Sequence, residues 1–199
     1  MNYLKHDKAL AEALKIFAAQ DPKSMAENSG AVYSQPYLNI AYFGQPVRIE
    51  FPSGKPDIEL DQSDHLLIIQ YLNSAKKIMP SGKWQSFLEL PGGPNHYPPF
   101  VARGIKPLAD KFGSDLTKFQ ERAEALSGEA IKMGDCGYLI KAFPYVDLAV
   151  CLWEADEEFE AEANILFDTN DIEYLTTAAL YILGINFSFK MREEAIISG

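Results

Sequence analysis

The stretch Tyr145–Trp153, with the sequence YVDLAVCLW, decides the fold. Its aromatic and β-branched residues favour extended backbone, and the run is bounded by Pro144 and by an acidic block that begins at Asp156. Two runs of similar character lie on either side of it, at Gly137–Ile140 and at Asn164–Phe167. The C-terminal half of the chain is therefore predicted to form a meander of three or four antiparallel strands.

The segment Glu154–Ala163, which joins two of these runs, gives conflicting signals. Its glutamates and alanines favour a helix by intrinsic propensity. However, Ala161, Ala163 and Ile165 alternate with polar residues, which is the pattern of a half-buried strand. We therefore expect a turn followed by a strand.

A second alternating pattern lies nearer the N-terminus. Tyr37–Phe43 is rich in strand-forming residues, and Val47–Phe51 alternates apolar and polar side chains. Gly44, Gln45 and Pro46 separate the two runs. This arrangement predicts a hairpin with one buried face.

Helical spacing of apolar residues covers much of the remaining chain. It predicts helices over Lys5–Ala19, Asp61–Lys77, Val101–Phe112, Asp115–Leu126 and Thr176–Leu183, the last of them stopped by Gly184. The predicted fold class is α+β: an antiparallel sheet, made of the N-terminal hairpin and the C-terminal meander, packed with about four to five helices. A chain of 199 residues, of which 47% are hydrophobic, is expected to form a single domain over residues 1–199.

Pro91–Pro99 is predicted to be an irregular loop, after an extended segment at Trp84–Leu90. Its prolines lack a backbone donor and its glycines allow unusual backbone angles. The loop is either a structural turn or a ligand site, in which Gly92 and Gly93 admit a ligand and His96 and Tyr97 contact it. It lacks the Lys-Ser/Thr pair of a phosphate loop and the third glycine of a dinucleotide turn.

The two tryptophans extend this candidate site. Trp84 and Trp153 could line a cavity for a flat cofactor such as a corrinoid or another tetrapyrrole, although aromatic residues at strand positions more often belong to the core.

An acidic constellation made of Asp156, Glu157, Glu158, Glu160 and Glu162 is the candidate metal site. A turn that gathers these carboxylates could bind a divalent cation, with Asp156, Glu157, Glu158 and Glu162 as ligands. The alternative is a solvated acidic turn beside an exposed strand edge, where the charges discourage aggregation. The spacing does not match an EF-hand, because no glycine occupies the sixth position.

The two cysteines could be neighbours. A tight hairpin centred between Phe143 and Pro144 would place Cys136 opposite Cys151, whereas a longer loop would shift the register. The thiols would then form a redox or metal pair, or simply pack as small hydrophobic side chains.

The formal charge of −10, from 28 acidic and 18 basic residues, argues against nucleic acid as a partner, because the cations are not concentrated anywhere. No signal-peptide core is present, and no uncharged apolar stretch approaches the roughly 20 residues that span a membrane. We expect a cytoplasmic protein with reduced thiols and no membrane association.

Four stretches carry a family resemblance: Trp84–Gly93, Pro107–Gly113, Trp153–Phe159 and Ala161–Asp168. The region from Ala31 to Leu183 resembles the bacterial and archaeal domain-of-unknown-function family 3786. Some members of that family are fused to a four-cysteine iron–sulfur domain like that of corrinoid iron–sulfur proteins, which implies anaerobic one-carbon or corrinoid metabolism. With two cysteines, this chain cannot hold such a cluster on its own thiolates.

Three hypotheses follow. The first is a non-catalytic module that binds a small molecule or cofactor, such as a corrinoid, between Pro91–Pro99 and Trp153–Glu162. The second is a metal-dependent enzyme that uses the acidic constellation, with His96 as a proton carrier. The third is an interaction subunit for an iron–sulfur or corrinoid protein, which requires an exposed apolar patch beside the acidic segment.

Overall fold

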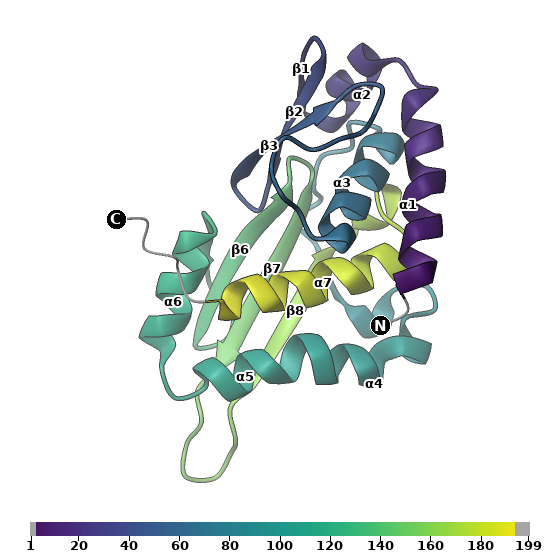
Figure 1. Ribbon diagram of the computed structural model, residues 1–199. Helices are drawn as coiled ribbons and strands as arrows, with labels where there is room; N and C mark the ends of the chain where they lie inside the picture. The colour runs from purple at the N-terminus through teal and green to yellow at the C-terminus, as the bar shows by residue number, and fades with distance from the viewer. Residues whose placement is uncertain (1–2, 194–199) are drawn as a thin grey trace.

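The computed structural model describes residues 3–193, with side chains from residue 7 onward, and confirms the α+β fold class (Figure 1). The α-helices are α1 (Tyr3–Ala18), α2 (Pro22–Ser29), α3 (Gln62–Ser74), α4 (Tyr97–Phe100), α5 (Lys106–Phe112), α6 (Leu116–Ala125) and α7 (Thr177–Arg192). The strands are β1 (Val32–Ser34), β2 (Tyr37–Tyr42), β3 (Gln45–Glu50), β4 (Trp84–Ser86), β5 (Glu129–Ile131), β6 (Cys136–Phe143), β7 (Val146–Trp153) and β8 (Glu162–Asp168). They form one sheet in the order β1-β2-β3 and a second in the order β4-β8-β7-β6-β5.

The larger sheet contains the predicted meander. Strands β6, β7 and β8 pair antiparallel in sequence order, and the short strands β4 and β5 add an edge on each side. The Glu- and Ala-rich segment is a loop up to residue 161 and joins β8 at Glu162. Alternation of apolar residues therefore predicted this segment correctly, where helix propensity did not.

The hairpin between β6 and β7 has a different register from the one that would pair the cysteines. Its two-residue turn is Pro144-Tyr145, and a bulge between Lys141 and Phe143 shifts the ladder. Consequently Cys136 pairs with Leu152, and Cys151 pairs with Gly137. Since successive residues of a strand point to opposite faces, the two thiols lie on opposite faces of the sheet.

The N-terminal hairpin forms as predicted, with a shorter turn. Phe43 and Gly44 both have positive φ, 48° and 75°, which is the geometry of a two-residue turn that suits the twist of the strands. Pro46 is therefore inside β3, opposite Ala41. This position is tolerated because β3 is an edge strand.

The prediction of an irregular loop at Pro91–Pro99 was wrong. Gly93–His96 forms a 3₁₀ helix, and a helical path continues through α4, a π-helical turn at Val101–Ile105 and α5. The prolines stand in the first turn of each piece, where the missing N–H has no helical partner to lose. The preceding segment is extended only over Trp84–Ser86 and then becomes 3₁₀ at Phe87–Glu89.

Gly184 does not end the last helix, because α7 continues to Arg192. A Cβ atom at Gly184 would lie 2.7 Å from ring atoms of Phe100 and 3.3 Å from the ring of Phe167. This glycine therefore permits close packing of α7 rather than acting as a stop signal.

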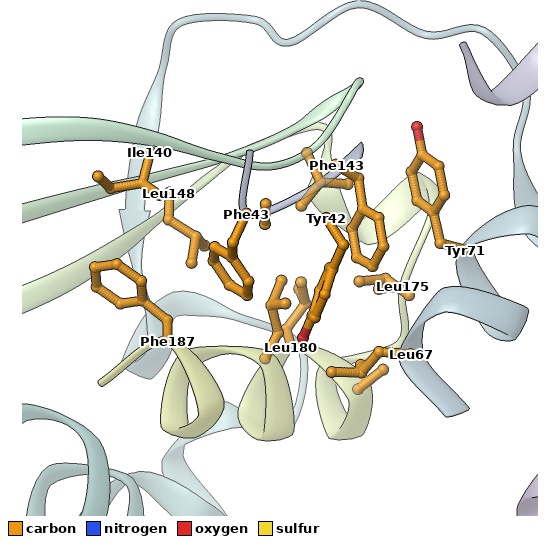
Figure 2. Close-up of a cluster of buried hydrophobic side chains, with 14 of the residues drawn as sticks. Tyr42, Phe43, Leu67, Tyr71, Ile140, Phe143, Leu148, Leu175, Leu180 and Phe187 are labelled. Carbon is orange, nitrogen blue, oxygen red and sulfur yellow. The ribbon is translucent and has the colours of Figure 1, made fainter. Parts of the chain in front are cut away.

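The helices α4, α5 and α7 lie across one face of the larger sheet (Figure 1). Ile140 and Leu148, which pair across β6 and β7, project toward Phe187 of α7 (Figure 2). Beside them, the ring of Tyr71 from α3 stacks on Phe143, with centroids 4.3 Å apart. Because Tyr42 of the smaller sheet also packs on Phe143, the two sheets share this aromatic core.

Candidate functional site

The candidate site is a cavity of about 810 Å³ between the helical path α4–α5 and the base of the β7–β8 hairpin. In Figure 1 this hairpin loop extends beyond the helices at the lower end of the molecule. The lining residues are Tyr97, Val101, Ile105, Lys106, Ala109, Asp110, Gly113, Ser114, Trp153, Ala155, Glu160, Ala161, Glu162, Ala163 and Asn164.

One wall of the cavity is an apolar stripe on the helical path. Tyr97, Val101, Ile105 and Ala109 follow one another at intervals of four residues, so they lie close to one line on a helix. Trp153, whose side chain is 38% exposed, also lines the cavity, and it is paired with Glu162 across β7 and β8. The cavity therefore offers a flat apolar group both aliphatic and aromatic contacts.

The base of the hairpin is tied to the helices and to the sheet. Ala155 donates its N–H to the carbonyl of Gly113, at 3.0 Å. Glu154 donates its N–H to Oδ2 of Asp135, at 2.9 Å. The cavity wall around Trp153 is thus fixed by hydrogen bonds from the backbone N–H groups of the two residues that follow it.

The charges in the cavity are predominantly negative. Lys106 Nζ forms an ion pair with Oδ1 of Asp110, at 2.7 Å, on the exposed face of α5. The hydrogen bond and charge of Asp110, with a further contribution from Glu160, raise the pKa of Lys106 above its ordinary value. Together with Glu162, the lining has three carboxylates for one ammonium group, so it favours cationic ligands.

The structure brings three of the predicted site residues together. Tyr97, Trp153 and Glu162 line the same cavity, although the first is separated from the other two by more than fifty residues of sequence. The lining residues that were not predicted as site residues come from Val101 to Ser114 and from the hairpin between Ala155 and Asn164. The sequence did predict the helix over Val101–Phe112 that carries several of them, but no local signal marks which of its faces lines a cavity.

Trp84, Gly92, Gly93 and His96 are not part of this cavity wall. Trp84 lies in β4, opposite Asp168. Gly93 packs so closely on the carbonyl of Phe87 that a Cβ atom would be 2.0 Å from it, which is a structural requirement. His96 is exposed, with its ring 6.3 Å from that of Tyr181.

The acidic residues Asp156, Glu157 and Glu158 lie in the exposed tip of the hairpin. Asp156 Oδ1 accepts the backbone N–H groups of Glu158 and Phe159, at 2.8 and 2.7 Å, and so caps the turn. Glu162, which was grouped with them, stands at the cavity instead. Within residues 3–193, no three His, Cys, Asp or Glu side chains are grouped so that they could hold a metal ion.

Burial governs the chemistry of both cysteines. It raises the pKa of Cys151 to about 11 and also raises the pKa of Cys136, to which the charge of Glu124 contributes. Both thiols are free, and both are held in the protonated, weakly nucleophilic form.

Four buried aspartates were not singled out by the sequence. Asp64 accepts hydrogen bonds from Tyr42, Asn186 and Lys190, and it lies beside a second cavity of about 390 Å³. Nothing in the sequence indicated that these four aspartates are buried, because an aspartate in a helix or strand is usually exposed. The other three, Asp147, Asp168 and Asp171, are buried near one another where β7 begins and β8 ends.

Comparison with known proteins gives a family but no described relative. The sequence model of a family described as Domain of unknown function (DUF3786) matches residues 21–189. No curated protein and no solved structure is detectably similar to the chain. No helix among the described residues is long and apolar enough to cross a membrane.

Proposed function

Because the chain belongs to the DUF3786 family, whose description assigns no activity, we propose from the geometry that it is a non-catalytic, cytoplasmic binding module with its ligand in the helix–hairpin cavity. The observation that carries this proposal is the convergence of Tyr97, Trp153 and Glu162 on one cavity. Its volume of about 810 Å³ is within the range of small-molecule sites, which are roughly 300–1,000 Å³.

The lining favours a ligand with a flat or apolar part and a positive group. Trp153 and the stripe from Tyr97 to Ala109 offer apolar contact, and an aromatic face also attracts a cation. Asp110, Glu160 and Glu162 supply more negative charge than Lys106 neutralises. A corrinoid or another tetrapyrrole, which the family resemblance implies, is the cofactor version of this proposal.

The test uses the two tryptophan indole N–H signals in a ¹⁵N NMR spectrum, assigned with Trp84→Phe and Trp153→Phe. Tryptamine, an aromatic amine, should shift the Trp153 signal in a saturable way and leave Trp84 unchanged, because only Trp153 lines the cavity. Cyanocobalamin tests the corrinoid version in the same assay. Native mass spectrometry with elemental analysis of the purified protein would identify a ligand that is already bound. A Trp153 signal that no probe moves, in a protein that purifies empty, contradicts the proposal.

A second candidate function is an interaction subunit for an iron–sulfur or corrinoid protein. It requires an exposed apolar patch beside the acidic segment, and the apolar side chain that supports it is Phe159, which is 70% exposed in the tip of the acidic hairpin. Rigid aromatic anchors of this kind lower the entropic cost of association. The metal-dependent enzyme predicted from the same carboxylates receives no such support from the geometry of the described residues.

A further inference from the structure

Strand β4 is too short to cover the outer edge of β8. It pairs only with Leu166–Asp168, and after Ser86 the chain turns away into a 3₁₀ helix. Because β4 is the last strand on that side, residues Glu162–Ile165 have no strand beyond them within the part of the chain that the structure describes. Unpaired stretches of this kind present backbone donors and acceptors to an incoming chain.

The hydrogen bonds between β4 and the end of β8 show to which side the backbone N–H groups of β8 point. Thr169 donates its N–H to the carbonyl of Lys83, at 2.9 Å, so this residue faces the β4 side. The backbone N–H and C=O groups of successive residues in a strand point to alternate sides, so those of Ala163 and Ile165 also point to the β4 side. The N–H of Ile165 is taken by the Asn164 side chain, at 2.9 Å, whereas the N–H of Ala163 has no partner on that side among residues 3–193.

This open edge is itself a wall of the candidate cavity. Ala163 and Asn164 line it together with Val101, Ile105 and Ala109 of the helical path, and the side chain of Ile165 packs near Gly104 of that path. The four residues that β4 leaves uncovered, Glu162–Ile165, span about 13 Å at roughly 3.3 Å per residue. The space is therefore a groove between a strand edge and a helix, which is the geometry that proteins use to bind an extended peptide by strand addition.

The two faces of the groove differ in character. The side chains of Ala163 and Ile165 lie on the apolar face of the sheet, on which Val101 and Ile105 pack. The side chain of Glu162 points to the other face of the sheet. An added strand would alternate between these faces in the same way. Its side chains on the Glu162 face would meet negative charge, which also disfavours the equally acidic edge of a second copy of this chain.

We propose that the ligand of this cavity is an extended segment of a partner protein, in which apolar residues alternate with lysine or arginine, and that it joins the sheet beside Glu162–Ile165. This inference rests on the proposed function, since it places a peptide in the same cavity. The carboxylate of Glu162 selects the basic residues, and the Ala163 backbone supplies the pairing.

The test uses an acetylated, amidated hexapeptide of alternating valine and lysine, titrated while the backbone amide signals of β8 are followed by ¹⁵N NMR. A strand added at an edge pairs through only every second backbone N–H group. Two further peptides therefore carry N-methyl groups either on the valine nitrogens or on the lysine nitrogens. One of them should lose at least about tenfold in affinity, and the other should still bind. The alternating valine–glutamate peptide should not bind. Equal binding of both isomers overturns the inference, because the backbone is then not paired.

Two variants sharpen the test. Ala163→Pro removes the free N–H without breaking a ladder bond and should weaken binding about tenfold, whereas Ala163→Val keeps the N–H and serves as its control. Glu162→Lys should shift the preference toward the valine–glutamate peptide and does not depend on how well the proline variant folds. If tryptamine moves the Trp153 signal but the peptides do not bind, the inference fails and the proposed function stands. If neither probe binds, both fail.

Discussion

The Nζ atom of Lys190 in α7 lies 2.7 Å from Oδ2 of Asp64 in α3. The Asp64 carboxylate is 6% exposed and the Lys190 side chain 26%, and Tyr42 from β2 donates to the other carboxylate oxygen at 2.6 Å. The network therefore joins three elements that are distant in sequence, at a point where an unpaired charge would be buried.

Lys190→Met should destabilise the fold by about 2–3 kcal/mol, because it leaves the Asp64 carboxylate buried without its cation. Lys15→Met, at an exposed ion pair with Glu12, should change the free energy of unfolding by no more than about 0.5 kcal/mol. Urea unfolding of both variants checks the difference. Equal, small effects would show that water already screens the Asp64 pair.

Two helical glycines give a matched pair of substitutions. Gly184→Ala should destabilise by about 1–3 kcal/mol, since the new methyl group would lie 2.7 Å from the ring of Phe100. Gly104→Ala has its nearest neighbours at 3.6 Å or more and should be neutral or stabilise by up to about 1 kcal/mol. Thermal unfolding distinguishes the two. Stabilisation by both would mean that α7 can move away from Phe100 at little cost.

Asp147 should make stability depend on pH. Burial raises its pKa to about 6; nearby Asp168 also raises it, and Lys141 opposes the shift. The folded state thus holds a proton more tightly than the unfolded chain, so this contribution is complete below pH about 4 and is lost as the pH rises through about 6. Asp147→Asn should therefore gain in melting temperature, relative to the parent, as the pH rises from 4.5 to 7.5. If the difference in melting temperature between the variant and the parent stays constant over this pH range, the raised pKa of Asp147 is contradicted.

The cysteines should remain separate thiols. They lie on opposite faces of the sheet, and the pKa of Cys151 is raised to about 11, so a thiol reagent at pH 8 should reach Cys151 only when the protein unfolds. Cys136 is half-buried and should react, but more slowly than free cysteine. Cys136→Ser serves as the control that isolates Cys151. Rapid reaction of two thiols in the folded protein, or an oxidised crosslink between them, would refute this arrangement.

The sequence by itself determined the elements whose pattern is local. Runs of strand-forming residues between Gly137 and Phe167 predicted the meander. Within it, the alternation of Ala161, Ala163 and Ile165 with polar residues outweighed the helix propensity of the glutamates, because side chains on a pleated strand must sort between core and solvent. The helix signals of α1, α3, α5 and α6 were equally local. The resemblance to the family, carried by the same short motifs, was confirmed by the match over residues 21–189.

Tertiary structure alone decided what depends on neighbours distant in sequence. The local sequence does not show that Pro94, Pro98 and Pro99 lie in the first turns of helical segments, since proline is equally common in loops. The local sequence also does not show that Gly184 lies against Phe100, that a bulge places the two cysteines on opposite faces of the sheet, or that Tyr97 and Trp153 line one cavity. The open edge of β8 follows from the length of β4, almost eighty residues earlier in the chain. Each of these features depends on contacts between segments that meet only when the chain folds, and the order of residues in the sequence does not specify the distance between such segments.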